Sequence, residues 1–442
     1  MRLRHFALIA LGGIALLLLG CNTGNGVVTV ASTQSQVRVV NLIPNAGAPI
    51  NVTVDDNPLA SGLNFETLAP YQTINAISNS NPTRTIQATV ESAPSNLIIT
   101  TVAPVGEAQY SYIMFGPLTA PIGQLYDDTV VDSGAGNFNL RVINAAAGIG
   151  AVDVYLTAPG EDLNLVSPTV TGIPYAGVTG FGTAPFGNLQ LRITSAGSKD
   201  VIFDSVPQVY AERASFDIVV YTRGSSTLPN VAVLNIDSTG NGSIVNSLLS
   251  QYKVINASTV GSALNVLFDG ILTLSNIPFT GSTGYQRVTA AQHTFSVQAT
   301  ATPGADLLTF APTLAAAMDT SIILEGPAGA LTATLLADNN LPPGPGNARV
   351  RVVNASADIA ALDVFVNFSR QISSLPQNSG AYSIELKADS ITGTAFQFEF
   401  NVAGTSQTVL TLPAVTLIGT KTYTIYVAGA GTALSAAITQ DN

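Results

Sequence analysis

The chain has 442 residues, of which 46% are hydrophobic and only 10% are charged. That composition is too apolar for a disordered chain and too poor in Glu, Lys and Leu for a helical protein. The formal net charge of −11 argues against nucleic acid as a partner, because phosphate backbones are repelled by a field of that sign.

The first twenty residues have the pattern of a secretion signal. Arg2, Arg4 and His5 form a charged start, and residues 6–19 form an apolar run shorter than the ~20 residues of a membrane-spanning helix. The run leads into Gly20 and Cys21, an ending that resembles a bacterial lipoprotein signal. The resemblance implies that Cys21 becomes the lipidated first residue of the mature protein.

Cys21 is the only cysteine of the chain, so it has no disulfide partner and no company for a metal site. The alternative is an ordinary signal peptide cleaved near a chance cysteine, and Leu19 departs from the small residue usual in lipoprotein signals. Asn22 is compatible with sorting to the outer membrane. We therefore predict a signal peptide over 1–20, a flexible tether over 21–36, and attachment to the membrane through the lipid at Cys21.

One apolar strand motif occurs four times, each time with a cation at its second position and Asn at its end. The copies are Val37–Asn41, Leu140–Asn144, Tyr252–Asn256 and Val350–Asn354. A spacing of about one hundred residues is that of a whole domain rather than a solenoid turn.

Further features recur after each copy. A second alternating strand follows at 50–54, 152–156, 264–268 and 362–366. An aromatic residue then begins a central strand pair, at Tyr71, Phe181, Tyr285 and Tyr382. Each unit closes in a hairpin that runs into acid or amide, at Asp127-Asp128, Asp237, Asp338-Asn339 and Asp441-Asn442. Short helices are considered only at 244–251 and 314–318.

About seven short strands per hundred residues, with turn signals between them, predict an all-β fold. We expect four tandem immunoglobulin-like β-sandwich domains at 37–132, 138–237, 250–339 and 348–442. The chain lacks Trp and a second Cys, so the likeness to immunoglobulin domains is one of sandwich architecture only. Four such domains in a row could reach on the order of 100 Å from a membrane.

These strands resemble the bacterial repeat called domain of unknown function 4397. The resemblance rests on the opening strand that ends in Asn, the hydrophobic-Asp-Val-aromatic second strand and the later Tyr. It covers nearly all of 37–440 and is clearest in the second and fourth units, whereas Asn51 and Asn265 replace the expected Asp in the other two. The family implies no activity and no catalytic residues.

His293 is the only histidine after the leader, and a Ser-His-Asp triad could use it. No Gly-x-Ser-x-Gly elbow accompanies it and the other units have no counterpart, so a surface strand residue is the simpler interpretation.

Metal and cofactor sites are not expected. The acid pairs Asp55-Asp56, Asp127-Asp128 and Glu161-Asp162 are calcium candidates, but solvated turn acids explain them better. Turn chemistry likewise explains the glycine pairs at 134–136 and 180–182 better than phosphate binding does. Tyr110, Tyr112, Tyr423 and Tyr426 could form a sugar-stacking surface, although core positions account for most such residues.

The recurring cation allows two hypotheses. In the first, each cation meets the polar residue of the second strand on an outward face, as Arg38 with Asn51, Arg141 with Asp153, Lys253 with Asn265 and Arg351 with Asp363. In the second, each cation protects an edge strand from pairing with another chain.

The leading interpretation is a non-catalytic, lipid-anchored protein of the bacterial cell envelope that acts as a structural or interaction module. The outer membrane is the expected location, with the periplasmic and surface faces both open. A glycan- or polymer-binding lipoprotein is the alternative, and it predicts exposed aromatic residues at equivalent places in several units. A hydrolase that uses His293 of the third unit is the third possibility.

Overall fold

The computed structural model describes residues 33–442 except 45, 47, 92, 225–227 and 345. In this part of the chain 34 strands form eight sheets. The helical elements among these residues are three 3₁₀ turns, η1 (Leu163–Leu165), η2 (Ala328–Ala330) and η3 (Gly431–Ala433). The prediction of tandem all-β sandwiches is confirmed.

Each sandwich contains eight or more strands rather than about seven. The first consists of β1 (Gln34–Leu42), β2 (Ile50–Val54), β3 (Asn57–Leu63), β4 (Thr67–Asn75), β5 (Arg84–Val90), β6 (Ala93–Val102), β7 (Gln109–Phe115) and β8 (Ile122–Asp127). The second consists of β9 (Asn137–Asn144), β10 (Val152–Thr157), β11 (Val170–Ile173), β12 (Gly182–Pro185), β13 (Gly187–Ser195), β14 (Val201–Asp204), β15 (Gln208–Tyr210), β16 (Ser215–Arg223), β17 (Asn230–Asp237) and β18 (Gly242–Ile244).

The other two sandwiches have eight strands each. The third consists of β19 (Leu249–Asn256), β20 (Leu264–Phe268), β21 (Ile271–Ile277), β22 (Gln286–Thr289), β23 (Phe295–Ala299), β24 (Asp306–Phe310), β25 (Asp319–Glu325) and β26 (Thr332–Ala337). The fourth consists of β27 (Asn347–Ser356), β28 (Ala361–Val366), β29 (Ser369–Pro376), β30 (Ser379–Lys387), β31 (Thr394–Val402), β32 (Thr408–Leu417), β33 (Thr422–Gly429) and β34 (Ser435–Gln440).

Neither of the two short helices that were considered is present. Residues 244–251 end β18 and begin β19, and residues 314–318 form a turn in which Ala317 has a φ of 56°. Val245 and Leu314 of these segments are buried by strand and turn packing, which outweighs the weak helical propensity of the segments.

All four sandwiches share one strand order. In the three sandwiches of eight strands, the first, fourth, seventh and eighth strands form what we call the inner sheet, as in β4-β1-β7-β8, and the second, third, fifth and sixth form the outer sheet, as in β3-β2-β5-β6. The second sandwich has the same order with two added strands, because β18 extends its inner sheet β12-β9-β16-β17 and β15 pairs with β13 of its outer sheet β11-β10-β13-β14. The opening strand lies in the middle of the inner sheet, antiparallel to the fourth strand and parallel to the seventh. The motif that occurs four times is therefore a central strand, never an edge strand.

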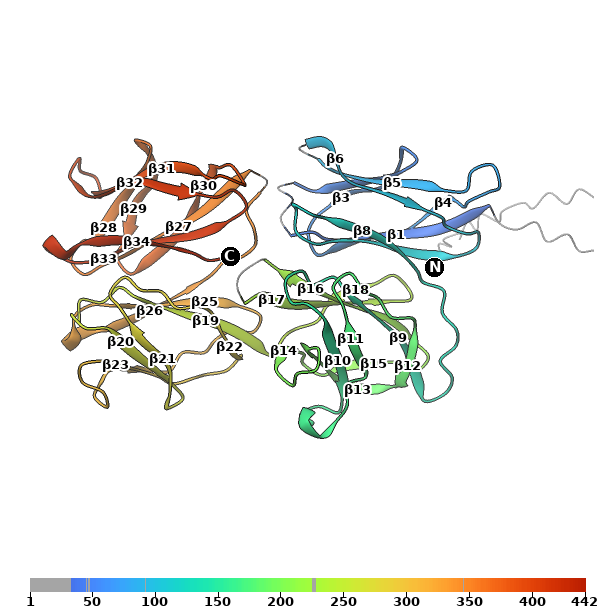
Figure 1. Ribbon diagram of the computed structural model, residues 1–442, viewed down its shortest axis with the longest axis horizontal. Helices are drawn as coiled ribbons and strands as arrows, with labels where there is room; N and C mark the ends of the chain where they lie inside the picture. Colours follow the sequence, from blue (N-terminus) through green and yellow to red (C-terminus); the bar gives the residue numbers. More distant parts are fainter. Residues whose placement is uncertain (1–32, 45, 47, 92, 225–227, 345) are drawn as a thin grey trace, which may run out of the picture.

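The inner sheets of neighbouring sandwiches face each other, so the four domains form two pairs (Figure 1). The first and second sandwiches share a buried apolar cluster that includes Val40, Ile113, Ile143 and Val219. The third and fourth share a smaller one that includes Ile255, Ile323, Val353 and Tyr426. An inner sheet is thus covered on both faces, which explains why the opening strands are apolar at almost every position.

The two pairs lie side by side in a two-by-two block and not in a row (Figure 1). At their junction the Nδ2 atom of Asn230 lies 3.3 Å from Oδ1 of Asp319, and the carbonyl of Pro229 accepts from the side chains of Gln251 and Arg287. The expectation of a long linear array is therefore wrong. The described residues contain no helix long and apolar enough to cross a membrane.

Candidate functional site

The opening strand of each unit presents its two faces to two different cores. In β1, Val37 and Val39 belong to the core of the first sandwich, whereas Val40 and Leu42 belong to the cluster shared with the second. Because side chains alternate along a strand, Arg38 shares the face of Val40 and Leu42. The motif cation therefore lies at a domain–domain interface.

Charge cluster A, defined as Arg38, Asp128, Arg141 and Asp217, lies between the first two sandwiches. The Nη2 atom of Arg38 is 3.3 Å from Oδ2 of Asp217 and 3.5 Å from Oδ2 of Asp128. Arg141 contacts the same acids, with Nη2 2.6 Å from Oδ1 of Asp128 and Nε 2.7 Å from Oδ1 of Asp217. No side chain of the four is more than 7% exposed. Each acid thus contacts both guanidinium groups, and the four charges cancel.

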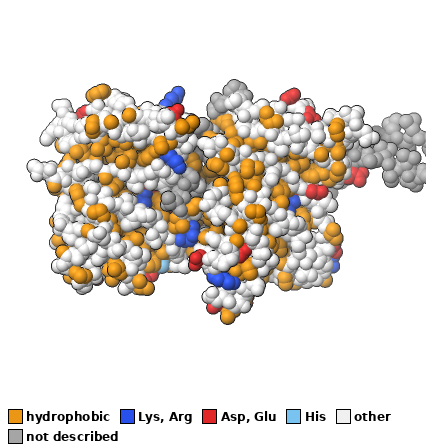
Figure 2. All heavy atoms as spheres, viewed as in Figure 1, with side chains coloured by type: hydrophobic (Ala, Val, Ile, Leu, Met, Phe, Trp, Pro, Cys, Tyr) orange, Lys and Arg blue, Asp and Glu red, His pale blue; other side chains and the backbone are white. Residues whose placement is uncertain are grey.

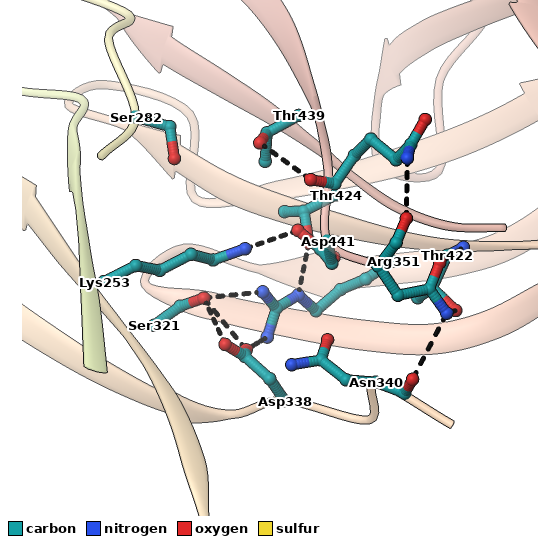
Figure 3. Close-up of polar contacts among 12 residues, drawn as sticks. Lys253, Ser282, Ser321, Asp338, Asn340, Arg351, Thr422, Thr424, Thr439 and Asp441 are labelled. Atoms are coloured by element: carbon teal, nitrogen blue, oxygen red, sulfur yellow. Dashed lines mark hydrogen bonds and ion pairs between the residues drawn. The ribbon is translucent and has the colours of Figure 1, made fainter. Parts of the chain in front are cut away.

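Charge cluster B, defined as Lys253, Asp338, Arg351 and Asp441, lies between the third and fourth sandwiches (Figure 3). Nζ of Lys253 donates to Oδ1 of Asp441, and Nη1 of Arg351 donates to Oδ1 of Asp338 at 2.5 Å. These side chains are at most 2% exposed. Among the described residues each acid here forms an ion pair with one cation, and that cation comes from the opposite sandwich.

Hydroxyl groups connect the charges within each cluster. In cluster B, Arg351 donates to Oγ1 of Thr424 at 3.0 Å and to Oγ of Ser321 at 2.9 Å. Thr424 in turn donates to Asp441 at 2.6 Å, and Ser321 donates to Asp338 at 2.8 Å. Cluster A has one such link, from Arg38 through Ser111 to Asp128. The buried charges of the two clusters are therefore hydrogen-bonded, as their desolvation requires.

The hydroxyl and the acid occupy fixed positions in three of the units. The hydroxyl lies on the seventh strand, directly opposite the cation, and the acid follows the eighth strand; these pairs are Ser111 with Asp128, Ser321 with Asp338, and Thr424 with Asp441. The second sandwich exchanges them. Asp217 lies opposite Arg141, and Ser238 follows β17. Both clusters nevertheless hold two cations and two acids.

The recurring aromatic residue stacks on the recurring cation. The cation lies over the ring at 5.0 Å for Arg38 and Tyr71, 4.6 Å for Arg141 and Phe181, 4.9 Å for Lys253 and Tyr285, and 4.8 Å for Arg351 and Tyr382. The hydroxyls of Tyr71 and Tyr285 also donate to Asp128 and Asp338. Cation, hydroxyl, aromatic and acid therefore form one recurring structure.

Burial and charge act in opposite directions on the ionisable groups of the clusters. Burial raises the pKa of Asp217 and of Asp441, and neighbouring cations offset part of that rise. Burial alone lowers the pKa of Arg141, but the carboxylates of Asp217 and Asp128 more than compensate and hold it above its usual value. Burial together with the Asp338 carboxylate raises the pKa of Tyr285, so its hydroxyl stays a donor. The clusters are suited to hold two domains together.

A third buried acid lies near cluster B. Asp319 accepts from Nδ2 of Asn340 at 2.6 Å and from Nδ2 of Asn230 at 3.3 Å, and no cation of the described residues lies within ion-pair distance of it. Burial raises the pKa of Asp319 to about 6, and the charge of Asp338 contributes to the rise.

Both hypotheses about the recurring cation are wrong. Arg141 lies on β9 of an inner sheet and Asp153 on β10 of an outer sheet, so they cannot pair across neighbouring strands. The edge-strand hypothesis fails because every opening strand is central. In a sandwich, consecutive strands can belong to different sheets, and the partners of the cation lie far along the chain.

The polar residue of the second strand instead fixes a bulge in the third strand. Its side-chain oxygen accepts from a backbone N–H of a residue with positive φ: Asn51 from Gly62, Asp153 from Gly172, Asn265 from Asn276 and Asp363 from Ser374. The two Asp residues have a second oxygen and also accept from Gly197 and Gly404. Units with Asp at this position thus have two backbone N–H groups that donate to the side chain, whereas units with Asn have one.

The Asn at the end of each opening strand connects the two sheets. The amide of Asn41 donates to the carbonyl of Leu63 at 3.1 Å, and its Oδ1 accepts from the N–H of Ile43. Asn144, Asn256 and Asn354 donate to Ile173, Ile277 and Leu375 in the same way. The motif Asn is therefore structural, and its burial leaves no group free for a ligand.

His293 is buried in the loop before β23 and is not a surface strand residue. Its Nδ1 lies 2.8 Å from Oδ2 of Asp269, and its Nε2 lies 2.9 Å from the carbonyl of Thr289. Nε2 also lies 3.4 Å from Oγ1 of Thr289, so both ring nitrogens contact groups of the neighbouring turns. The hydrogen bond from His293 lowers the pKa of Asp269, which fits a structural clamp on the β20–β21 turn.

The other candidate groups have structural roles. The acid pairs do not converge, and the described residues contain no group of three or more Asp, Glu, His or Cys side chains that could hold a metal ion. Asp162 caps η1 and Asp55 accepts from the N–H of Thr85. Phe181, between Gly180 and Gly182, stacks on Arg141.

The four candidate sugar-stacking tyrosines are buried, at 6% exposure or less. The hydroxyls of Tyr110 and Tyr423 accept from the N–H groups of Val105 and Ile418, five residues upstream. This is the arrangement of a tyrosine corner, so the core interpretation of these residues is confirmed. Cys21 and the leader lie outside the described residues.

The cation, the aromatic and the closing acid are separate features of the sequence, and the sequence does not predict that they meet. Their recurrence at equivalent positions in four units was the available signal. The fold and the clusters together define a protein of paired β-sandwiches whose repeated polar residues hold the pairs together.

A family model, Domain of unknown function (DUF4397), matches residues 35–155 and 250–365, which is more than half of the chain. The chain therefore belongs to this family. Each match covers one whole sandwich and the first two strands of its partner, so it is the first and third units that match throughout, and not the second and fourth as expected. No curated protein matches the chain.

Two solved structures show a distant similarity. A CBM26 carbohydrate-binding module from Eubacterium rectale Amy13K, in complex with maltoheptaose, is 11% identical over 42% of this chain and 91% of its own, with a TM-score of 0.15. The Bacillus anthracis TIE protein is 7% identical over 92% of this chain and 69% of its own, with a TM-score of 0.16. Superpositions this weak carry no argument about function.

Proposed function

We propose that the protein is a non-catalytic, lipid-anchored component of the bacterial cell envelope, in which two rigid sandwich pairs form a structural or interaction module. The observation that carries this proposal is the use of the repeated polar residues. Cation, hydroxyl, acid, aromatic and Asn are all engaged in contacts inside or between sandwiches. The residues that recur in the four units therefore serve the folding and assembly of the domains.

The anchor rests on the sequence of the leader. Cys21 follows an apolar run and is the only cysteine, and the residues after the leader carry 14 cations against 27 acids. Figure 2 shows that charged side chains are few and scattered on one face of the molecule. A lipid at Cys21, rather than a basic patch, would hold such a protein at an outer membrane.

The glycan-binding alternative requires exposed aromatic residues at equivalent positions. Among the described residues the exposed Phe side chains are Phe186, Phe279 and Phe368. They lie before β13, after β21 and in the β28–β29 turn, which are different places in the repeat. The aromatic residues therefore do not favour this alternative.

Metabolic labelling with a palmitate analogue tests the anchor. We expect the wild-type chain to be labelled and Cys21→Ala to be unlabelled and released into the soluble fraction. Digestion of intact cells by an added protease then separates the surface from the periplasmic face. Equal labelling of both chains, or equal fractionation, would refute lipid anchoring at Cys21.

A further inference from the structure

A cavity of about 570 Å³ lies where the two sandwich pairs meet. The loops that follow β1, β7, β9 and β16 form one side of it, at the end of the apolar interface between the first two sandwiches. Pro342 and Pro343, between the third and fourth sandwiches, and Thr420 and Lys421, before β33, form the other side. All the parts of this cavity thus come together only in the assembled block.

The walls of the cavity are aliphatic. Leu42, Leu118 and Ala145 line it together with five prolines, and the described lining residues include no aromatic ring and no acid. Sugars are recognised by aromatic stacking and by many polar groups, which these walls do not provide. Aliphatic walls match a flexible hydrocarbon chain instead.

The polar side chains among the described lining residues are three threonines and Lys421. Lys421 is partly buried, and no described residue forms an ion pair or hydrogen bond with its Nζ. An ammonium group at an aliphatic wall, without a carboxylate among its lining neighbours, is complementary to an anionic group on a ligand.

We propose that this cavity binds a single-chain anionic amphiphile, with the hydrocarbon chain against the leucine and proline walls and the anionic head beside Lys421. The volume lies within the range of about 300 to 1,000 Å³ that is typical of ligand sites. This site is independent of the charge clusters and goes beyond the proposed structural role.

Calorimetric titration of the full chain with dodecanoate, below its micelle concentration, tests the proposal. The chain carries Cys21→Ala so that no acyl group of its own competes. We expect one site per chain and an affinity that rises about fourfold for each methylene from octanoate to dodecanoate. Dodecanol, which has the same chain without the charge, should bind about tenfold more weakly. Absence of binding, or no dependence on chain length, would overturn the proposal.

Two variants locate the site. Lys421→Gln should remove the preference for dodecanoate over dodecanol, whereas Lys387→Gln, at an exposed lysine outside the cavity, should keep it. Ala147→Phe should fill the cavity and weaken both ligands more than tenfold. Ala357→Phe, at the equivalent position of the fourth sandwich and outside the cavity, should bind like the parent. Equal binding by the members of either variant pair would place the ligand elsewhere and refute this site.

Discussion

The two sandwich pairs use the same kinds of side chain and connect their charges differently. In cluster A both acids contact both arginines, whereas in cluster B Lys253 pairs with Asp441 and Arg351 pairs with Asp338. A shared network can lose one cation and still leave each acid with a partner. In two separate ion pairs the loss of one cation leaves one acid without a partner. The interface of the first pair therefore tolerates the loss of a cation better than the interface of the second pair does.

The apolar parts of the two interfaces differ in the same direction. Twelve buried hydrophobic residues form the shared cluster between the first two sandwiches, against seven between the third and fourth. Less apolar area is available to offset the desolvation of charge in the second pair. Its stability should therefore depend more strongly on each ion pair.

The largest expected effect is the loss of one cation from cluster B. Arg351→Met keeps the aliphatic stem but leaves Asp338 buried without a cation, which should destabilise the third and fourth sandwiches by about 3 to 5 kcal/mol. Arg38→Met should cost the first pair only about 1.5 to 3 kcal/mol, because Arg141 still holds both acids. Hydrogen exchange of peptides from β1 and β27 measures each pair separately.

Arg213→Met serves as the control for both variants. Arg213 pairs with Asp132 on the surface, where the side chains are 55% and 59% exposed, so its loss should cost no more than about 1 kcal/mol. Equal losses for Arg351→Met and Arg38→Met would show that sharing of the acids provides no redundancy.

The next effect concerns Asp319, the buried acid near cluster B that has no cation. Its pKa is about 6 in the folded chain against 3.8 for an ordinary Asp, so the folded state binds more protons between these values. The contribution of Asp319 to stability should therefore be complete below pH 4, fall as the pH rises through 4 to 6, and stay level above. The expected loss is on the order of 3 kcal/mol.

Asp319→Asn should remove this fall and stabilise the junction of the two pairs at pH 7. Denaturant unfolding between pH 4 and 8 measures the slope. Asp306→Asn is the control, because hydrogen bonds from Gln298 and Ser296 lower the pKa of that exposed acid and its contribution has the opposite sign. An unchanged slope in Asp319→Asn would mean that the buried carboxyl does not titrate in this range.

Double substitution distinguishes the two clusters more finely. Arg38→Met combined with Arg141→Met removes both cations from both acids, so the double variant should lose on the order of 2 kcal/mol more than the sum of the single variants. Lys253→Met combined with Arg351→Met should be close to additive, since each cation serves its own acid. Similar coupling energies in the two double-mutant cycles would contradict the conclusion that the acids are shared in cluster A and separately paired in cluster B.

Much of the fold follows from local pattern. The motif with a cation and a terminal Asn identifies four units, and alternation identifies the second strand, because both depend on residues that are neighbours in the chain. The core interpretation of the tyrosines is confirmed for the same reason, because it concerns the immediate surroundings of one strand. The interpretation of the acid pairs as solvated turn acids is wrong for Asp128, which is buried in cluster A and contacts Arg141 of the next sandwich.

The candidate site depended on contacts that local pattern does not contain. Arg38 meets Ser111 of its own sandwich 73 residues away and Asp217 of the next sandwich 179 residues away. The exchange of Asp217 and Ser238 hides the repeat further, because the closing acid position of the second unit holds a serine. Only the order of strands in the inner sheet brings these positions together.

The smallest expected effect compares the polar residues of the second strands across the two pairs. Asp363→Asn keeps the acceptor for the N–H of Ser374 and loses the one for Gly404, which should cost about 1 kcal/mol because that N–H can turn to water. Asp153→Asn should cost the same in the first pair. Asn265→Asp should not stabilise the third sandwich, because among the described residues its second oxygen would meet no free N–H equivalent to that of Gly404. The N–H of Gly304, in the corresponding turn, already donates to Gln298. Thermal unfolding of the three variants tests these expectations. A stabilised Asn265→Asp would show that the charge at this position matters more than the number of bulge and turn N–H groups that the side chain accepts from.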